Sequence, residues 1–228
     1  MKTCRPMPRA DCRALRRGLS GSGRRNPPVS RKAVTPNQFL MGLDMYAARR
    51  IYVKQWEHQR PEDRYAILVT RGGKPATDIH PGRISSVEEE SMYWRKANHI
   101  HNWFVENVQD GIDNCATYYV SPDQLNALLD ACERVIEASE LVDGVAHMAT
   151  IDDPDCPHGE VEAGPGGVIR DPTVAKQLLP TRSGFFFGSE HYDHYYLESV
   201  VETRDWIVRA LAETGEGSNA DIVYRASW

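Results

Sequence analysis

The segment YWRKANHIHNWFVENVQDG, Tyr93 to Gly111, concentrates side chains that could do chemistry. His99 and His101 have the spacing of a metal-binding pair on a β-strand, where residues i and i+2 share a face. The apolar residues around them recur at helical spacing, and on a helix two such histidines lie about 200° apart and cannot bind one ion. The pattern therefore predicts a helix without a metal site, with His99 on its exposed face.

His101 and Asn98 fall inside or beside the apolar stripe of this predicted helix. A buried polar group costs about 1–3 kcal/mol when it is left without a hydrogen bond. The two side chains therefore either belong to an internal polar network, which is the more common state, or line a pocket. In a catalytic pocket, His101 could act as a general base oriented by Asp110 or Asp193. The turn composition after the helix explains Asp110 and Asp113 without any such role.

Two other segments have weaker chemical signals. His191 and His194, at i and i+3, could share a helix face and bind a metal weakly, but a solvated surface is the expected state. Residues 152–170 are rich in Pro, Gly and Asp and predict a loop that lacks the Lys-Ser/Thr ending of a phosphate-binding loop. The sequence contains no nucleophile elbow, zinc-protease motif, dinucleotide fingerprint or CxxC pair. No metal or cofactor is predicted.

The elements that must position these residues follow from apolar periodicity and capping signals. The expected strands are Asp44–Lys54, Arg64–Arg71, Thr117–Val120, the short buried run Phe185–Phe187, and Asp221–Trp228. The expected helices are 86–108, a helix capped by Ser121 that runs to about Glu137, and Tyr192–Glu213 with Ser189 as its cap. We predict an α+β fold: a single domain with a mainly antiparallel sheet, strands near both ends, and three to four helices packed on it.

Charge divides the chain at about residue 40. Residues 1–40 hold ten Lys or Arg and one acid, whereas residues 41–228 hold seventeen basic and thirty-one acidic side chains. The basic extension, predicted to be disordered, could be a nucleic-acid-binding tail, a targeting peptide or the result of a mis-called start codon. We favour the last, because globular patterning begins abruptly at Met41. The acidic body argues against nucleic acid as a partner, and no apolar run approaches the ~20 residues that cross a membrane.

Several motifs of the body follow one another in a recognisable order. They are MGLDMY at 41–46, TRGGKP at 70–75, YWRKAN at 93–98, ENVQDG at 106–111, YYVS at 118–121, LLPT at 178–181, SGFFFGS at 183–189 and a terminal SW. On these motifs, residues 41–228 resemble a family of small uncharacterised proteins of bacteriophage and prophage genomes. The resemblance implies a cytoplasmic, phage-borne accessory protein, and it implies no activity.

The motif segments suggest a binding module for a host protein or a nucleotide-like small molecule. Aromatic side chains together with Lys and Arg suit stacking combined with phosphate contact. The candidate ligand-binding residues are Tyr93, Trp94, Arg95, Lys96, Asn98, His101, Asn107, Ser183, Phe187 and Ser189. The alternative is a small hydrolase or transferase that uses His101 with a nearby Asp.

Overall fold

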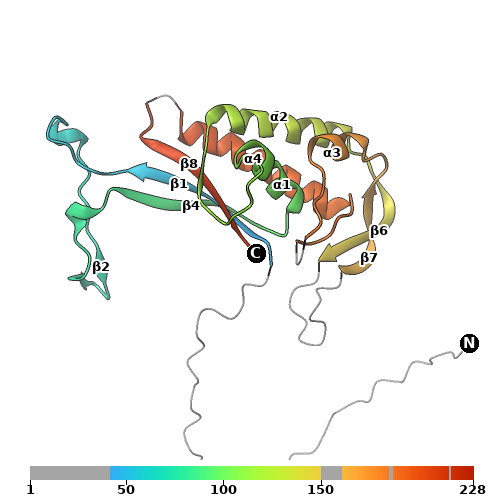
Figure 1. Ribbon diagram of the computed structural model, residues 1–228, viewed down its shortest axis with the longest axis horizontal. Helices are drawn as coiled ribbons and strands as arrows, with labels where there is room; N and C mark the ends of the chain where they lie inside the picture. The colour runs from blue at the N-terminus through green and yellow to red at the C-terminus, as the bar shows by residue number, and fades with distance from the viewer. Residues whose placement is uncertain (1–41, 150–160, 185–186, 216) are drawn as a thin grey trace, which may run out of the picture. The chain divides into compact units, whose positions relative to one another are not determined.

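An antiparallel sheet of four strands, in the order β4-β1-β8-β5, organises the chain (Figure 1). The computed structural model describes residues 42–149, 161–184, 187–215 and 217–228. Its main strands are β1 (Asp44–Tyr52), β4 (Ser86–Arg95), β5 (Tyr118–Val120) and β8 (Ala220–Ser227). The strands nearest the two ends of the described chain, β1 and β8, are therefore neighbours at the centre of the sheet.

In the described part of the chain four α-helices accompany the sheet, and α1, α2 and α4 gather on one of its faces (Figure 1). The helices are α1 (Asn98–Asn107), α2 (Pro122–Ala138), α3 (Thr173–Leu178) and α4 (His194–Glu213). Helix α2 packs against both α4 and α3. The predicted α+β fold with a mainly antiparallel sheet is confirmed. None of the described helices has the length and apolar composition needed to cross a membrane.

Two smaller hairpins lie outside the main sheet. Strands β2 (Thr70–Arg71) and β3 (Lys74–Pro75) form one, within a segment that also contains 3₁₀ turns at Pro61–Asp63 and Pro81–Arg83. Strands β6 (Leu141–Ala149) and β7 (Val161–Ile169) form the other. We call residues 54–85 the arm: they leave the sheet where β1 ends and return where β4 begins. The strand predicted at 64–71 is thus reduced to its last two residues.

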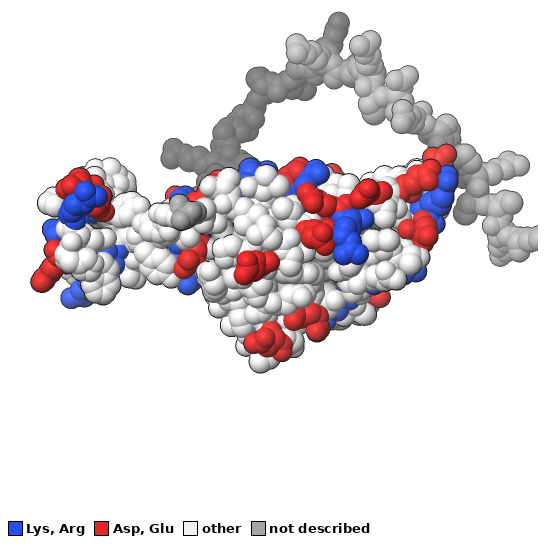
Figure 2. Space-filling model, turned by 90° about the horizontal axis from the view of Figure 1, so that it is seen from above, with Lys and Arg blue, Asp and Glu red and all other residues white. Residues whose placement is uncertain are grey.

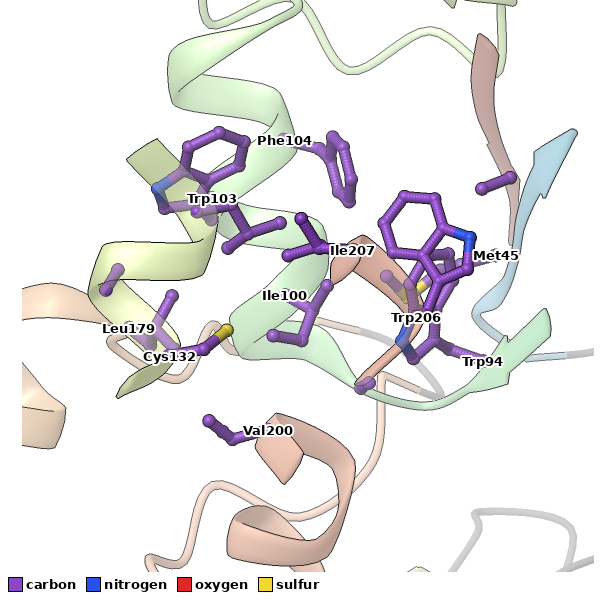
Figure 3. Packing of buried hydrophobic residues seen from close by; sticks show 14 of the residues in the cluster. Met45, Trp94, Ile100, Trp103, Phe104, Cys132, Leu179, Val200, Trp206 and Ile207 are labelled. Carbon is purple, nitrogen blue, oxygen red and sulfur yellow. The ribbon is translucent and has the colours of Figure 1, made fainter. Parts of the chain in front are cut away.

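The apolar core lies between the helices and the inner face of the sheet. Trp94 of β4 meets Trp206 of α4 edge to face, with ring centroids 5.1 Å apart (Figure 3). Phe104 of α1 stacks on Tyr224 of β8 at 3.8 Å. Side chains alternate along each strand, so these rings and Met45 of β1 share the face that the helices cover. The core thus joins α1 and α4 to the sheet at residues that flank the candidate site.

The structure corrects the helix predicted over residues 86–108, because the first half of that segment is β4. Lys96 follows the strand with a left-handed φ of +58°. The N–H of Asn98 then donates to the Lys96 carbonyl across Ala97, whose φ and ψ are −80° and 67°. These angles make an inverse γ-turn, which takes the chain from strand to helix within two residues. Neither Gly nor Pro marks this turn, so the apolar spacing runs through it unbroken.

The acids expected in the first turn of that helix stabilise strand pairing instead. Glu88 and Glu89 lie 2.7 and 3.0 Å from Arg50 and Arg49 on the neighbouring strand. Strand β4 also bulges at Ser91, where the register with β1 shifts. A strand with three consecutive Glu residues is therefore held by its partner strand, through contacts that local propensity does not reveal.

The remaining predictions divide between confirmed and corrected elements. Strands β1, β5 and β8 are confirmed, and so is α2 with its capping box between Ser121 and Gln124. Helix α4 is confirmed, but its cap is Asp193 rather than Ser189. The loop predicted at 152–170 is strand β7 from residue 161 onward, and residues 152–160 lie outside the described part. Phe187 is buried but lies in no strand, and the other two Phe residues of its run are not described.

Glycines explain why β6 and β7 were not recognised as strands. A Cβ on Gly144 would lie 2.6 Å from the side chain of Val168, and one on Gly166 would lie 2.8 Å from the ring of His194. These glycines therefore serve close packing within a hairpin and beneath a histidine ring. In the sequence alone they are typical of a loop.

Candidate functional site

A pocket of about 250 Å³ opens where the end of β4, the start of α1, strand β6 and the N-terminus of α4 meet. The four segments are far apart in the sequence, and each contributes polar side chains. The residues that line the pocket are Arg95, Lys96, Ala97, His99, His147, Ser189, His191, Asp193, Tyr195, Tyr196 and Ser199. Three histidines, two basic residues and one carboxylate thus surround a space of ligand size.

Two of these histidines form a parallel stack. The rings of His147 on β6 and His191 before α4 have centroids 3.7 Å apart and planes inclined by 17°. His147 is partly buried, whereas His191 is exposed. The stack therefore forms part of the pocket wall and reaches solvent through His191, and a planar ring of a ligand could pack against it.

Asp193 fixes the position of this wall. One carboxylate oxygen accepts hydrogen bonds from the backbone N–H groups of Tyr195 and Tyr196, which caps α4. The other oxygen accepts from the N–H of His147 at 2.7 Å. Both oxygens of this buried carboxylate are thus engaged with backbone donors, so Asp193 joins β6 to α4 and is poorly placed to act as an acid or base.

His99 forms the buried floor of the pocket. Its Nε2 lies 3.0 Å from the hydroxyl of Ser199, and that hydroxyl donates to the carbonyl of Tyr196. Because the only hydroxyl hydrogen is used there, Nε2 carries the ring proton and donates to Ser199. Burial lowers the pKa of His99 to about 3. The floor is therefore a neutral imidazole at physiological pH.

Arg95 and Lys96 supply positive charge at the pocket edge. The Arg95 guanidinium lies 3.4 Å from the carboxylate of Asp44, which also accepts a hydrogen bond from the hydroxyl of Tyr93. Lys96 is placed by its own left-handed backbone and by a hydrogen bond from its N–H to the carbonyl of Leu43. The pocket edge therefore carries two cationic side chains, of which Arg95 is already paired with Asp44, and cationic groups of this kind attract an anionic group.

Of the ligand-binding residues predicted from the sequence, three line the pocket: Arg95, Lys96 and Ser189. Asn98 lies behind them and holds the loop that carries Ser189. Its side-chain amide donates to the carbonyls of Phe187 and Ser189, and its oxygen accepts from the N–H of Arg182. Asn98 is therefore a positioning residue for one wall of the pocket.

The other predicted ligand residues lie elsewhere. Trp94 and Phe187 are core residues, and Tyr93 is exposed on the outer part of β4. Asn107 caps its own helix end by donating to the Trp103 carbonyl, and Ser183 is exposed outside the pocket lining. The motif segments combine packing, capping and pocket residues, and their sequence order does not separate these roles.

His101 belongs to a buried network rather than to the pocket. Its Nδ1 lies 2.8 Å from the hydroxyl of Tyr224, and its Nε2 lies 3.1 Å from the carboxylate of Asp113. The ring has no exposed surface, and burial lowers its pKa. The carboxylate bonded to His101 is thus neither Asp110, which is an exposed turn residue, nor Asp193. The sequence left two states open for His101, an internal polar network or a pocket lining, and the structure shows the internal network.

Sequence reasoning missed much of the pocket lining. His99 was expected to be exposed, and it is buried because Tyr196 and Ser199 of α4 cover that side of α1. His147 lies in a strand that was not predicted, and His191 was expected to be solvated surface. His194 does not join the stack, since its ring packs on Tyr195 at 3.9 Å. Among the described residues, no group of three or more His, Cys, Asp or Glu could hold a metal ion.

The arrangement can bind a ligand without an evident catalytic set. A neutral imidazole, two serine hydroxyls, a flat aromatic stack and two cations provide recognition, and the carboxylate is used structurally. Comparison of the chain with protein-family models, with curated proteins and with solved structures finds no match.

Proposed function

We propose that this protein is a binding module that holds a small nucleotide-like molecule in the pocket beside His147 and His191. The observation that carries the proposal is the parallel histidine stack at 3.7 Å next to two basic side chains. A nucleobase has the planar π-face that such a stack accepts, and a phosphate has the charge that Arg95 and Lys96 favour.

The pocket size and its hydroxyl groups support a ligand at the small end of this class. Its volume of about 250 Å³ lies just below the range of roughly 300–1,000 Å³ that is usual for ligand pockets. A nucleoside or nucleoside monophosphate therefore suits it better than a triphosphate. Ser189 could donate to, or accept from, ribose hydroxyls and base edges, whereas Ser199 could only accept, because its hydrogen is donated to the Tyr196 carbonyl.

The resemblance to phage and prophage proteins adds the biological setting of the proposal. We infer a phage-borne accessory protein that acts in the bacterial cytoplasm, where nucleotides are abundant. The alternative of a hydrolase or transferase built on His101 receives less support, because that ring has no exposed surface. A host protein as the ligand is the remaining alternative, and the experiment below separates it.

The test begins with the full chain purified from a bacterial cytoplasm without denaturation. The protein is then unfolded, and the released small molecules are identified by mass spectrometry. We expect a nucleotide-like compound in stoichiometric amount, or, if the ligand is lost in purification, saturable binding of a nucleoside monophosphate in calorimetric titration. An empty protein that binds none of the common nucleoside monophosphates would contradict the proposal and direct the search to host proteins.

Variants locate the site. His191→Ala should weaken binding about tenfold to hundredfold, because base–aromatic stacking contributes roughly 1–3 kcal/mol. His80→Ala is the matched control, since His80 is exposed on the arm and lies outside the pocket lining. Equal affinity of the two variants would mean that the ligand binds elsewhere.

A further inference from the structure

The arm, residues 54–85, is folded without a single buried residue. Its hairpin, its 3₁₀ turns and an ion pair of 2.7 Å between Arg71 and Asp78 give it a defined backbone. It nevertheless exposes large apolar side chains, among them Trp56 at 52 % and Leu68 at 80 %. Ordering a chain costs about 1–2 kcal/mol per residue, and apolar burial normally offsets that cost. A structured segment with these exposures is typical of an interaction surface.

The charge of the arm narrows the kind of surface that can cover it. The arm has six Lys or Arg and four Asp or Glu, and three of those acids are held within the arm by Arg60 and Arg71. Lys74 and Arg83 make no ion pair with any described residue. The arm therefore presents apolar groups together with uncompensated positive charge, and its complement is a groove in which acidic side chains lie beside apolar ones.

The same chain has such a groove between β4 and α4. Two adjoining pockets of about 350 and 220 Å³ share Arg209. We call this groove the trough. Five acidic residues and two arginines are among the residues that line it, which are Arg49, Glu89, Glu90, Ser91, Met92, Tyr93, Glu202, Asp205, Trp206, Arg209 and Glu213. Arg49 is paired with Glu89, so the acids outnumber the remaining cation. Glu90, Glu202 and Glu213 make no ion pair with the described residues. The surface around the trough is acidic as well, since residues 86–228 hold nine Lys or Arg against twenty-six Asp or Glu.

Asp and Glu side chains are also spread over the side of the molecule on which α2 lies, with Lys and Arg side chains among them (Figure 2). The negative charge that would attract a basic arm is therefore not confined to the trough. It extends over the neighbouring helical surface and would steer an approaching arm toward it.

We propose that the protein forms a dimer in which the arm of each copy lies in the trough of the other. The arm leaves the sheet where Tyr52 pairs with Ser86 and projects away from the helices (Figure 1). It thus lies outside its own trough, which begins beside residues 89–93 further along β4. Two copies related by a two-fold axis would make the same arm–trough contact twice and close the assembly. The inference does not depend on the ligand pocket.

The oligomeric state of the full chain tests the inference, measured by analytical ultracentrifugation over a series of concentrations. We expect a reversible dimer that weakens as salt is added, because opposite charges meet at the contact. Trp56→Ala with Leu68→Ala should weaken association about tenfold or more, and so should Glu202→Lys with Asp205→Lys. Ile112→Ala and Asp143→Lys are the controls, since both residues are exposed outside the arm, the trough and α2 and should leave the dimer intact.

A mixture of the arm variant and the trough variant distinguishes the proposed arm–trough contact from any other symmetric contact. The arm variant retains a native trough and the trough variant retains a native arm, so their mixture can form one intact contact. We expect the mixture to associate more strongly than either variant alone, with thermal unfolding that shows both to be folded. A wild-type chain that stays monomeric at every concentration would overturn the inference. So would a mixture of folded variants that associates no better than its components.

Discussion

Gly188 packs directly on the backbone of Lys96. A Cβ on Gly188 would lie 2.8 Å from both the carbonyl oxygen and the Cβ of Lys96. Both residues have positive φ, +98° for Gly188 and +58° for Lys96. The contact joins the loop before α4 to the turn between β4 and α1, and these are two walls of the pocket. The position of Lys96 in the pocket therefore depends on the missing side chain at Gly188.

Gly188→Ala should lower the free energy of unfolding by about 2–4 kcal/mol, because strain at a positive φ adds to a clash with rigid backbone. Urea unfolding measures the change. Gly82→Ala is the matched control: no atom lies within 4 Å of a Cβ there, and its φ is not in the left-handed region. The control should change stability by less than roughly 0.5 kcal/mol. Equal effects of the two substitutions would rule out the close contact.

The elements that the sequence predicts correctly carry their own local signals. Strand β8 alternates, and α2 opens with Ser121, Pro122 and Gln124, which satisfy its first N–H groups whatever the rest of the fold does. Local signals of this kind do not depend on distant residues. They can therefore be recognised in the sequence without knowledge of the sheet.

The errors occur where long-range contacts override local propensity. Strand β4 is stabilised by Arg49 and Arg50 of β1, and the turn at Lys96 has no Gly or Pro to mark it. The pocket is the extreme case, since His147 and His191 stack although 44 positions separate them in the chain. Arg95, Lys96 and Ser189 of the pocket were predicted from motif chemistry, whereas Ser199 was not. The histidines required the topology, which no single-sequence pattern contains.

The left-handed turn at Lys96 can be separated from the charge that it places in the pocket. Lys96→Gly and Lys96→Ala both remove the ammonium group, so both should weaken nucleoside monophosphate binding to the same extent. Only glycine relieves the positive φ, and Lys96→Gly should therefore be more stable than Lys96→Ala by about 1 kcal/mol. Calorimetric titration and urea unfolding measure the two effects. If alanine were as stable as glycine at this position, the left-handed turn would be contradicted.

The indole N–H of Trp94 depends on one hydroxyl in the core. It donates to Oγ1 of Thr203 at 2.8 Å, and that hydroxyl in turn donates to the Ser199 carbonyl. Thr203→Val keeps the shape and removes the acceptor, so the buried N–H loses its partner at a cost of about 1–3 kcal/mol. Thr214→Val removes a hydroxyl that also bonds the carbonyl four residues earlier, but no buried donor relies on it. Thermal unfolding should show a clearly larger loss for Thr203→Val than for this control.

Burial of His99 predicts a specific dependence of stability on pH. Its pKa falls from the ordinary value of 6.5 to about 3 because the charged ring would lose its hydration. Below pH 6.5 the unfolded chain binds a proton that the folded chain does not bind until about pH 3. The unfolded state therefore binds more protons in this window, and stability falls as the pH falls, by at most about 1.4 kcal/mol per pH unit from this group.

His99→Gln should remove this contribution. We expect the free energy of unfolding to depend less steeply on pH in the variant than in the wild type. The difference in slope corresponds to at most one bound proton. Urea denaturation at a series of pH values between those two pKa values measures it. Subtracting the curve of the variant from that of the wild type removes the contributions of the carboxylates and of His101, because these groups are present in both proteins. His58→Gln, at an exposed position on the arm, should leave the slope almost unchanged. A slope that is the same in wild type and His99→Gln would mean that His99 is hydrated, and the neutral floor of the pocket would then be wrong.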